Sequence, residues 1–238
     1  MSLLDGILEA FRLIITLDPY LLRIVLLSLQ VSGAAIIIST LLGVPLGTWL
    51  GMCEERKTRL INKIIYTLMG LPPVVAGLAI YLLLSRQGLL GVLGLLYTPV
   101  AMVTAQVALA LPIVTGLTMV GIRSRGRELE ETARTLGAGP LLTAWTVIRE
   151  CRYSILGAVV TGFGRVVAEV GAVMIVGGNI EGRTRVMTTA MVLETGKGHF
   201  ELAIGLGLIL LAIYFVINSL LYTFQKESPE GGESHARR

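Results

Sequence analysis

The chain has 238 residues, of which 54% are hydrophobic and only 15% charged, with a formal net charge of +4. Its mean hydropathy is +0.77, and soluble domains carry roughly a quarter charged residues, so the composition excludes a soluble domain with a simple anchor. It predicts one all-α integral membrane domain over residues 1–225 and a disordered polar tail over residues 226–238.

The first fifteen residues predict an amphipathic helix. Apolar residues recur there at helical spacing, while Asp5, Glu9 and Arg12 occupy the opposite face. Such a helix lies on the outer surface of the membrane rather than across it. A sixth span is the alternative, which the shortness and the charges of this segment disfavour.

Five later segments are apolar and long enough to cross a bilayer core of roughly 30 Å. About five transmembrane helices are therefore expected, at approximately residues 21–52, 61–84, 98–122, 154–177 and 202–224. Prolines fall inside these spans at Pro45, Pro72, Pro73 and Pro112. Each one removes a backbone hydrogen bond, so each predicts a kink.

The first span also carries a ladder of small residues. Ser39, Gly43, Gly47 and Gly51 follow one another at intervals of four, on one helix face. Small residues let helix backbones approach closely in lipid. The contact predicted here lies either between two copies of the chain or within one copy, and the pattern does not choose between them.

The orientation follows from the basic residues, because Lys and Arg concentrate in cytoplasmic loops. One side collects thirteen of them: Arg56, Lys57, Arg59, Lys63, Arg123, Arg125, Arg127, Arg134, Arg149, Arg152, Lys226, Arg237 and Arg238. The other side has six: Arg12, Arg23, Arg86, Arg183, Arg185 and Lys197. The first side is therefore predicted to be cytoplasmic, with the N-terminus outside and the C-terminus inside. Cys53 and Cys151 fall on the cytoplasmic side, where free thiols are the expectation.

The segment 123–153 is a charged, helix-forming block between apolar spans. Its pattern predicts a short helix over residues 128–136, a turn at Gly137 and a second short helix lined by Leu141, Trp145 and Ile148. An exposed hydrophobic edge of this kind favours docking of a soluble partner. A cytoplasmic connector packed on its own bundle is the alternative.

This block resembles the coupling loop of ABC-importer permeases. The family pattern is Glu-Ala-Ala, three residues, Gly, nine residues and then Ile-x-Leu-Pro. It is matched by Glu131, Thr132, Ala133, Gly137 and Val147, although Thr132 replaces the middle Ala and Arg149-Glu150 stands where the family has Leu-Pro. The resemblance implies that an ATP-binding subunit docks here. The residues assigned to that contact are Glu131, Thr132, Ala133, Gly137, Ala138, Leu141 and Trp145.

Segments 71–85, 164–180 and 183–190 resemble permeases for molybdate, tungstate and sulfate, most of all those for tungstate. The resemblance implies an importer of a tetrahedral oxoanion in the prokaryotic cytoplasmic membrane, with molybdate or sulfate as alternatives to tungstate. It also implies a second copy of this chain, cytoplasmic ATP-binding subunits and an external substrate-binding protein. Neither a cofactor nor a nucleic acid is expected.

Arg165 and Glu169 are the ionisable residues that lie deep in a predicted span. They are four residues apart and so share one face of a helix. Charges at this depth either face an aqueous path or pair with each other. Arg165 would then guide the anion with Glu169 as its counter-charge, or the two would form a structural pair, which is the favoured interpretation.

The outer connector 179–200 predicts a short helix over residues 184–195, stopped by Gly196. This helix would seat an external binding protein or plug the outer mouth of the pore. His199 is a lone surface histidine, and with no second ligand nearby a metal site is not expected.

Other functional classes fit less well. The phosphate-binding pattern G-x-x-x-x-G-K-[ST] is absent, so the chain is not expected to hydrolyse ATP itself. An intramembrane protease or lipid-modifying enzyme needs a nucleophile with a base, or a metal cluster, and the spans carry one carboxylate and no His or Cys cluster. A stand-alone channel or carrier often contains inverted repeats. We find none, and that class leaves the block 123–153 unexplained.

Overall fold

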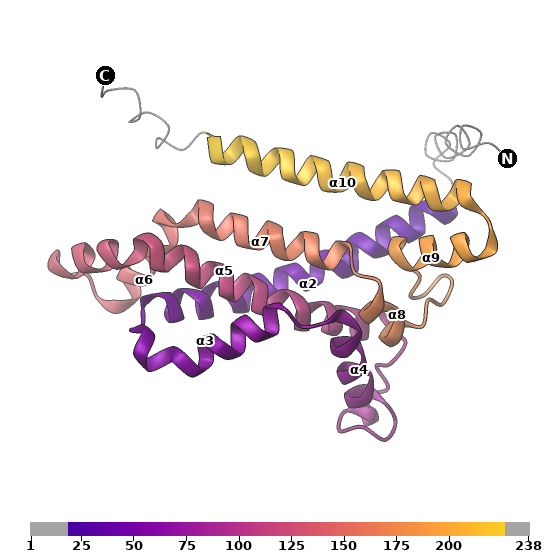
Figure 1. Ribbon diagram of the computed structural model, residues 1–238, viewed down its shortest axis with the longest axis horizontal. Helices are drawn as coiled ribbons and strands as arrows, with labels where there is room; N and C mark the ends of the chain where they lie inside the picture. Colours follow the sequence, from indigo (N-terminus) through magenta and orange to yellow (C-terminus); the bar gives the residue numbers. More distant parts are fainter. Residues whose placement is uncertain (1–18, 227–238) are drawn as a thin grey trace.

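The computed structural model describes residues 19–226, which are all-helical apart from turns and connections (Figure 1). The α-helices are α2 (Pro19–Met52), α3 (Glu55–Met69), α4 (Pro73–Leu84), α5 (Pro99–Thr135), α6 (Pro140–Glu150), α7 (Arg152–Val167), α8 (Gly171–Gly177), α9 (Met187–Lys197) and α10 (Phe200–Lys226), and one 3₁₀ turn spans Gly91–Leu93. The amphipathic helix predicted over the first fifteen residues and the predicted disordered tail lie outside the described residues.

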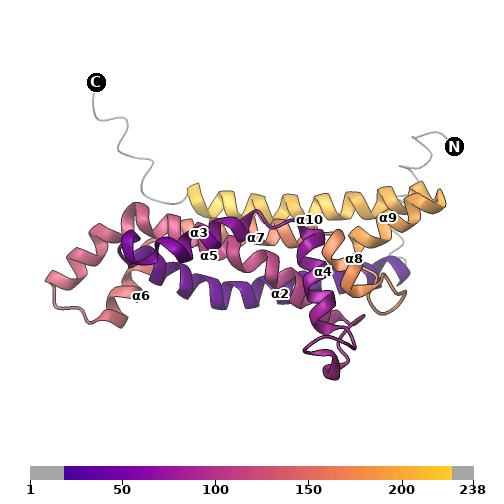
Figure 2. The same ribbon diagram turned by 60° about the horizontal axis from the view of Figure 1, so that its bottom comes forward.

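The long helices lie side by side and define two ends of the molecule. Helices α2, α5, α7 and α10 run along the longest axis, with α6 at one end and α8 and α9 at the other (Figures 1 and 2). Helix α4 and the connection that follows it project sideways from the end occupied by α8. The predicted cytoplasmic block, which contains α6, and the predicted outer connector, which contains α9, therefore lie at opposite ends of the molecule.

The prediction of about five spans is confirmed. Within residues 19–226, three helical stretches are long and apolar enough to cross a membrane: Pro19–Met52, Pro99–Ser124 and Phe200–Ser219. Counting each of two bent helix pairs as one span brings the number to five, α3 with α4 at 103° and α7 with α8 at 58°. The second and fourth predicted spans are thus broken, where the sequence analysis expected continuous helices.

The first break has a local chemical cause. Helix α3 ends at Met69, and Pro73 begins α4 as its first residue. Proline is favoured at that position because its missing N–H would have no helical partner there, and it disfavours helix in the residue before it. Pro72 and Pro73 therefore start a new helix rather than kink a continuous one. Pro45 and Pro112 do lie inside helices, α2 and α5 respectively.

The glycine ladder packs within one copy of the chain. A Cβ added to Gly47 would lie 2.5 Å from the Thr115 carbonyl oxygen, and one added to Gly51 would lie 2.7 Å from Ile122 Cβ. A Cβ added to Gly43 would likewise lie 3.1 Å from Thr115 Oγ1. All these neighbours belong to α5, so the face that the ladder presents is covered by α5 and is not free for a second copy.

Helix α5 extends further than the sequence analysis expected. It runs without interruption from Pro99 to Thr135, so the predicted separate helix over residues 128–136 is its last two turns. The segment 123–135 has no proline and is rich in Arg and Glu, which are good helix formers. The third span therefore continues into the predicted cytoplasmic block as one uninterrupted helix.

Candidate functional site

The end of the molecule formed by α5 and α6 contains the helix–turn–helix that the sequence predicts. Gly137 has a left-handed backbone with φ +82°. The N–H of Ala138 donates to the carbonyl of Ala133 at 3.0 Å, and the N–H of Gly137 donates to that of Arg134 at 3.0 Å. These bonds close the C-terminus of α5, and α6 begins three residues later at Pro140. A residue with a side chain at Gly137 would be strained.

The two faces of this motif differ in burial. Ala133 and Val147 are buried, and Val147 packs in a cluster with Ile122 and Ile155. On the other side, Leu141 is 86% exposed and Trp145 is 63% exposed. One face therefore packs on the bundle, while the other presents large, mostly exposed apolar side chains. Glu131 and Thr132 are exposed beside them, and Ala138 is half-buried.

An apolar groove of about 1070 Å³ lies between the end of α2 and helix α6. Its walls include Trp49 and Met52 of α2 and Pro140, Leu141 and Trp145 of α6. Because two tryptophans and a leucine face open space here, the groove can take an apolar side chain of a partner.

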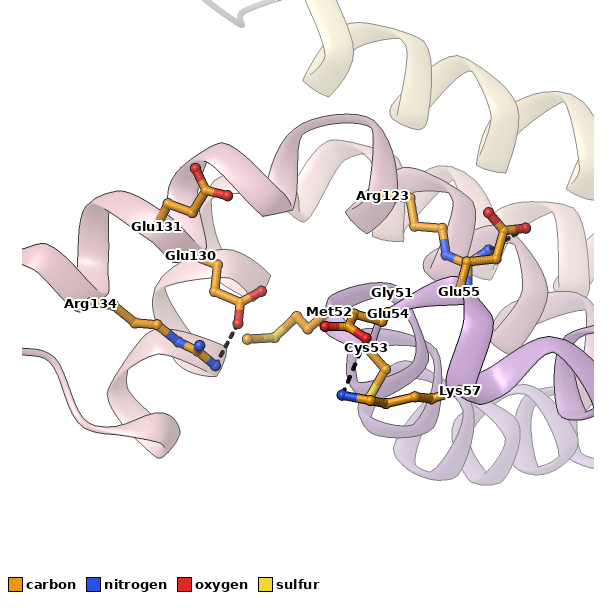
Figure 3. Close-up of a pocket in the computed structure, with 10 residues that line it drawn as sticks. All are labelled: Gly51, Met52, Cys53, Glu54, Glu55, Lys57, Arg123, Glu130, Glu131 and Arg134. Carbon is orange, nitrogen blue, oxygen red and sulfur yellow. Dashed lines mark ion pairs between the residues drawn. The ribbon is translucent and has the colours of Figure 1, made fainter.

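A polar pocket of about 500 Å³ adjoins the groove and shares Met52, Cys53, Glu130 and Arg134 with it. Figure 3 shows Glu130 and Arg134 on the α5 side and Glu54 and Lys57 on the opposite side. The facing charges pair locally, Arg134 with Glu130 at 2.6 Å and Lys57 with Glu54 at 3.2 Å. The pocket therefore combines both signs of charge rather than forming an anion site.

The break in the fourth span contains the predicted ionisable pair. Helix α7 ends at Val167 and α8 begins at Gly171, so Glu169 lies between them and not on the helix of Arg165. Arg165 Nη1 nevertheless reaches Glu169 Oε2 at 2.8 Å. The side chain of Glu169 is 2% exposed and that of Arg165 is 32% exposed. The carboxylate is thus enclosed, while the guanidinium partly faces open space.

Further hydrogen bonds hold this break. Glu169 Oε1 accepts the N–H of Ala172 at 3.0 Å, and the Glu169 carbonyl accepts Thr188 Oγ1 from α9 at 2.8 Å. Gln106 of α5 donates from Nε2 to the Val166 carbonyl at 3.0 Å. Neither Gln106 nor Thr188 is predicted as a site residue from the sequence. Gln106 could have been noticed as the one amide side chain between residues 99 and 122, whereas Thr188 has no sequence signal.

The outer connector differs in detail from its prediction. Helix α9 continues through Gly196 and ends at Lys197, followed by the capping residue Gly198 with φ +83°. His199 is not isolated: its Nδ1 lies 2.8 Å from Glu194 Oε2, and Lys197 Nζ lies 2.9 Å from Glu194 Oε1. The hydrogen bond from His199 lowers the pKa of the Glu194 carboxyl, and Lys197 adds to this effect against the opposing influence of burial. Within residues 19–226 no group of three or more His, Cys, Asp or Glu side chains could hold a metal.

These features define the class of protein. The described residues form a helical bundle with up to five candidate membrane spans that ends in an exposed helix–turn–helix. Residues 43–227 match the family of binding-protein-dependent transport system inner membrane components. The chain belongs to this family of permeases.

Individual relatives agree with this assignment. The chain is 44% identical over 223 residues to the tungstate uptake system permease TupB of Peptoclostridium acidaminophilum, covering 94% of this chain and 98% of that one. It is 40% identical over 215 residues to a probable anion ABC transporter permease of Haloferax volcanii, covering 88% and 93%. Among solved structures it resembles an amino acid ABC transporter determined with histidines, with a TM-score of 0.68, 19% identity and coverage of 90% and 97%. That likeness concerns the fold alone.

Proposed function

We propose that the chain is the membrane-spanning subunit of an ATP-driven, binding-protein-dependent importer of a tetrahedral oxoanion, with tungstate as the substrate. The 44% identity with a tungstate permease over nearly its whole length carries the choice of substrate. Two copies of the chain would form the pore, two ATP-binding subunits would bind on the cytoplasmic side, and an external binding protein would deliver the anion.

The ATP-binding subunits dock on the end formed by α5 and α6. The exposed side chains of Leu141 and Trp145, beside an apolar groove that α2 completes, support this placement. Since α5 is continuous from the membrane to Thr135, a movement of the docked subunit is passed directly to the third span. The basic residues of this end support its cytoplasmic location.

The docking is tested with the double variant Gly137→Val/Glu131→Lys. A Cβ at Gly137 meets no neighbour within 4 Å, so the strain arises from the positive φ alone and costs roughly 1–2 kcal/mol. Co-purification of the ATP-binding subunit and tungstate uptake should both fall, while the permease still inserts. Gly33→Val is the matched control, because Gly33 lies in α2 away from the groove, has no positive φ and also has open space around its Cβ. Normal uptake by the double variant would refute the docking site.

The substrate is tested with the reconstituted complex in proteoliposomes. Tungstate uptake that depends on ATP and on the binding protein is the expected result, with molybdate and sulfate as competitors. Equal or better transport of sulfate would replace tungstate as the substrate and leave the transporter class intact. Failure of the wild-type permease to bind any ATP-binding subunit would refute the class of function itself.

The orientation is tested through the two cysteines. Cys53 is partly exposed and Cys151 is buried. A membrane-impermeant thiol reagent should label neither in intact cells and should label Cys53 after permeabilisation, whereas a Cys53→Ser variant should remain unlabelled. Labelling of Cys53 from outside would reverse the proposed topology.

A further inference from the structure

Helix α9 lies at the end of the molecule opposite to α6 (Figure 1), and its two faces differ in burial. Its first turn is buried, with Thr188 5% exposed and Thr189 fully enclosed. Its other face and its C-terminal turn are exposed, including Val192, Thr195 and Lys197. A helix of this kind can contact an external partner on one side and the membrane bundle on the other.

The buried face of α9 is bonded to the break in the fourth span. Thr188 Oγ1 donates to the carbonyl of Glu169 at 2.8 Å, across nineteen residues of sequence. Glu169 is the same residue whose carboxylate holds Arg165 Nη1 at 2.8 Å and the N–H of Ala172 at 3.0 Å. One residue in the break therefore connects α7, α8 and α9.

Helix α9 is joined to α2 at its start, and its C-terminal turn is held by local ion pairs. At its start the N–H of Met187 donates to Ser28 Oγ of α2 at 2.7 Å. At its end the enclosed carboxylate of Glu194 holds Lys197 and His199. Displacement of α9 consequently changes the position of the Glu169 carbonyl, because Thr188 is the side chain that joins the two.

We propose that Thr188 is a positioning residue for transport, which communicates docking of the external binding protein on the exposed face of α9 to Glu169 and Arg165 in the fourth span. This inference rests on the proposed function. Coupling between sites can be carried by packed side chains and hydrogen bonds that reach an element with two arrangements. We assign that element to the break at residues 168–170, since short segments between helices absorb changes in backbone angles.

The test uses the complete complex of permease, ATP-binding subunits and binding protein in proteoliposomes. ATP hydrolysis is measured with and without tungstate-loaded binding protein, together with tungstate imported per ATP. Thr188→Val keeps the shape of the side chain and removes the hydroxyl. We expect its stimulation by the loaded binding protein to fall about tenfold, within the ordinary range of coupling between sites, while basal hydrolysis stays unchanged.

Two further variants separate the hydrogen bond from the packing. Thr188→Ser keeps the donor and should retain the stimulation, whereas Thr188→Ala should lose it. Thr161→Val is the matched control, because the Thr161 hydroxyl donates only within α7, to the Gly157 carbonyl at 2.8 Å, and its loss should leave the stimulation unchanged.

The stimulation of ATP hydrolysis and the assembly of the variants decide whether Thr188 has this role. Stimulation of Thr188→Val at the wild-type level, or equal stimulation of the Ser and Ala variants, would refute the role of Thr188 while the transporter itself remains active. Loss of assembly in all three variants would refute it as well, because the hydroxyl would then hold the fold rather than communicate. Absence of ATP-driven uptake by the wild-type complex would instead refute the proposed function.

Discussion

The two broken spans are interrupted by different means and to different degrees. Between α3 and α4 the chain bends by 103°, and the hydrogen bonds there are local and between backbone groups, such as those from Gly70 to Thr67 and from Ala76 to Pro72. Between α7 and α8 it bends by 58° without any proline. A side chain of α9 bonds to the backbone of the break, and one of α5 bonds to the last turn of α7 beside it. The first break is therefore encoded in its own residues, and the second depends on distant parts of the chain.

The two breaks are connected in space. Helices α4 and α8, which follow the two breaks, pack directly on each other. A Cβ on Gly77 of α4 would lie 2.6 Å from Ala172 Cα, and one on Gly171 would lie 3.0 Å from Val74 Cγ2. A change in either break is thus passed to the other through backbone contacts that cannot move aside easily.

The largest effect is expected from Arg165→Ala, which leaves the enclosed Glu169 carboxylate without its cation. An unpaired buried charge costs roughly 3–5 kcal/mol, whereas removing both charges can be nearly neutral. Thermal unfolding in detergent should show this loss, and Arg165→Ala/Glu169→Gln should recover the stability, because the amide oxygen can still accept the Ala172 N–H.

Transport by the same two variants separates the two roles of Arg165. For a structural pair, the double variant recovers uptake together with stability. If Arg165 guides the anion, the double variant is stable and inactive. A single Arg165→Ala variant that is both stable and fully active would contradict both interpretations.

The next largest effect is expected where the two breaks meet. Gly77→Ala places a methyl group against the backbone of Ala172 and should cost roughly 1–3 kcal/mol by overpacking, measured by thermal unfolding. Gly33→Ala is the matched control, because Gly33 also lies inside a helix and its Cβ meets nothing within 4 Å. That control should be neutral or stabilising. Equal stability of both variants would argue against close packing of α4 on α8.

A smaller effect is expected from lowering the pH, which removes the charge of Glu194 near the junction of α9 and α10. The expected loss in the free energy of unfolding is about 1 kcal/mol, since the partners Lys197 and His199 are exposed. The pKa of Glu194 is lowered in the folded protein, so its contribution is present above the ordinary carboxyl pKa of roughly 4.3 and is lost as the pH falls through the lower folded value. Glu194→Gln should flatten the fall in unfolding temperature between about pH 6 and pH 3. The slope should persist in Glu181→Gln, whose carboxylate is exposed.

The smallest effect is expected from Pro72→Ala in the first break. Replacing a proline whose backbone angle already fits, here φ −61°, raises the entropy of the unfolded chain and costs about 0.4–1 kcal/mol. Since Pro73 still begins α4, the bend should persist, and uptake should remain close to that of the wild type. A large loss of uptake would show that the first break, like the second, depends on more than its local geometry.

The sequence by itself determined what depends on local composition and conformation. Apolar length predicted about five spans, because roughly twenty such residues cross a bilayer. The left-handed turn at Gly137 followed from a glycine placed after a helix-forming segment. The double proline marked the position of the first break, although its consequence is a new helix rather than a kink.

The tertiary structure decided what depends on which helices become neighbours. The same ladder of Gly43, Gly47 and Gly51 would serve a contact with any helix, and only the fold assigns it to α5. The second break contains no proline, so the sequence suggested a continuous helix through residues 154–177. Glu169 leaves that helix because it bonds to Arg165, Ala172 and Thr188 at once. Hydrogen bonds between residues far apart in the chain carry no local pattern, which is why only the folded protein reveals them.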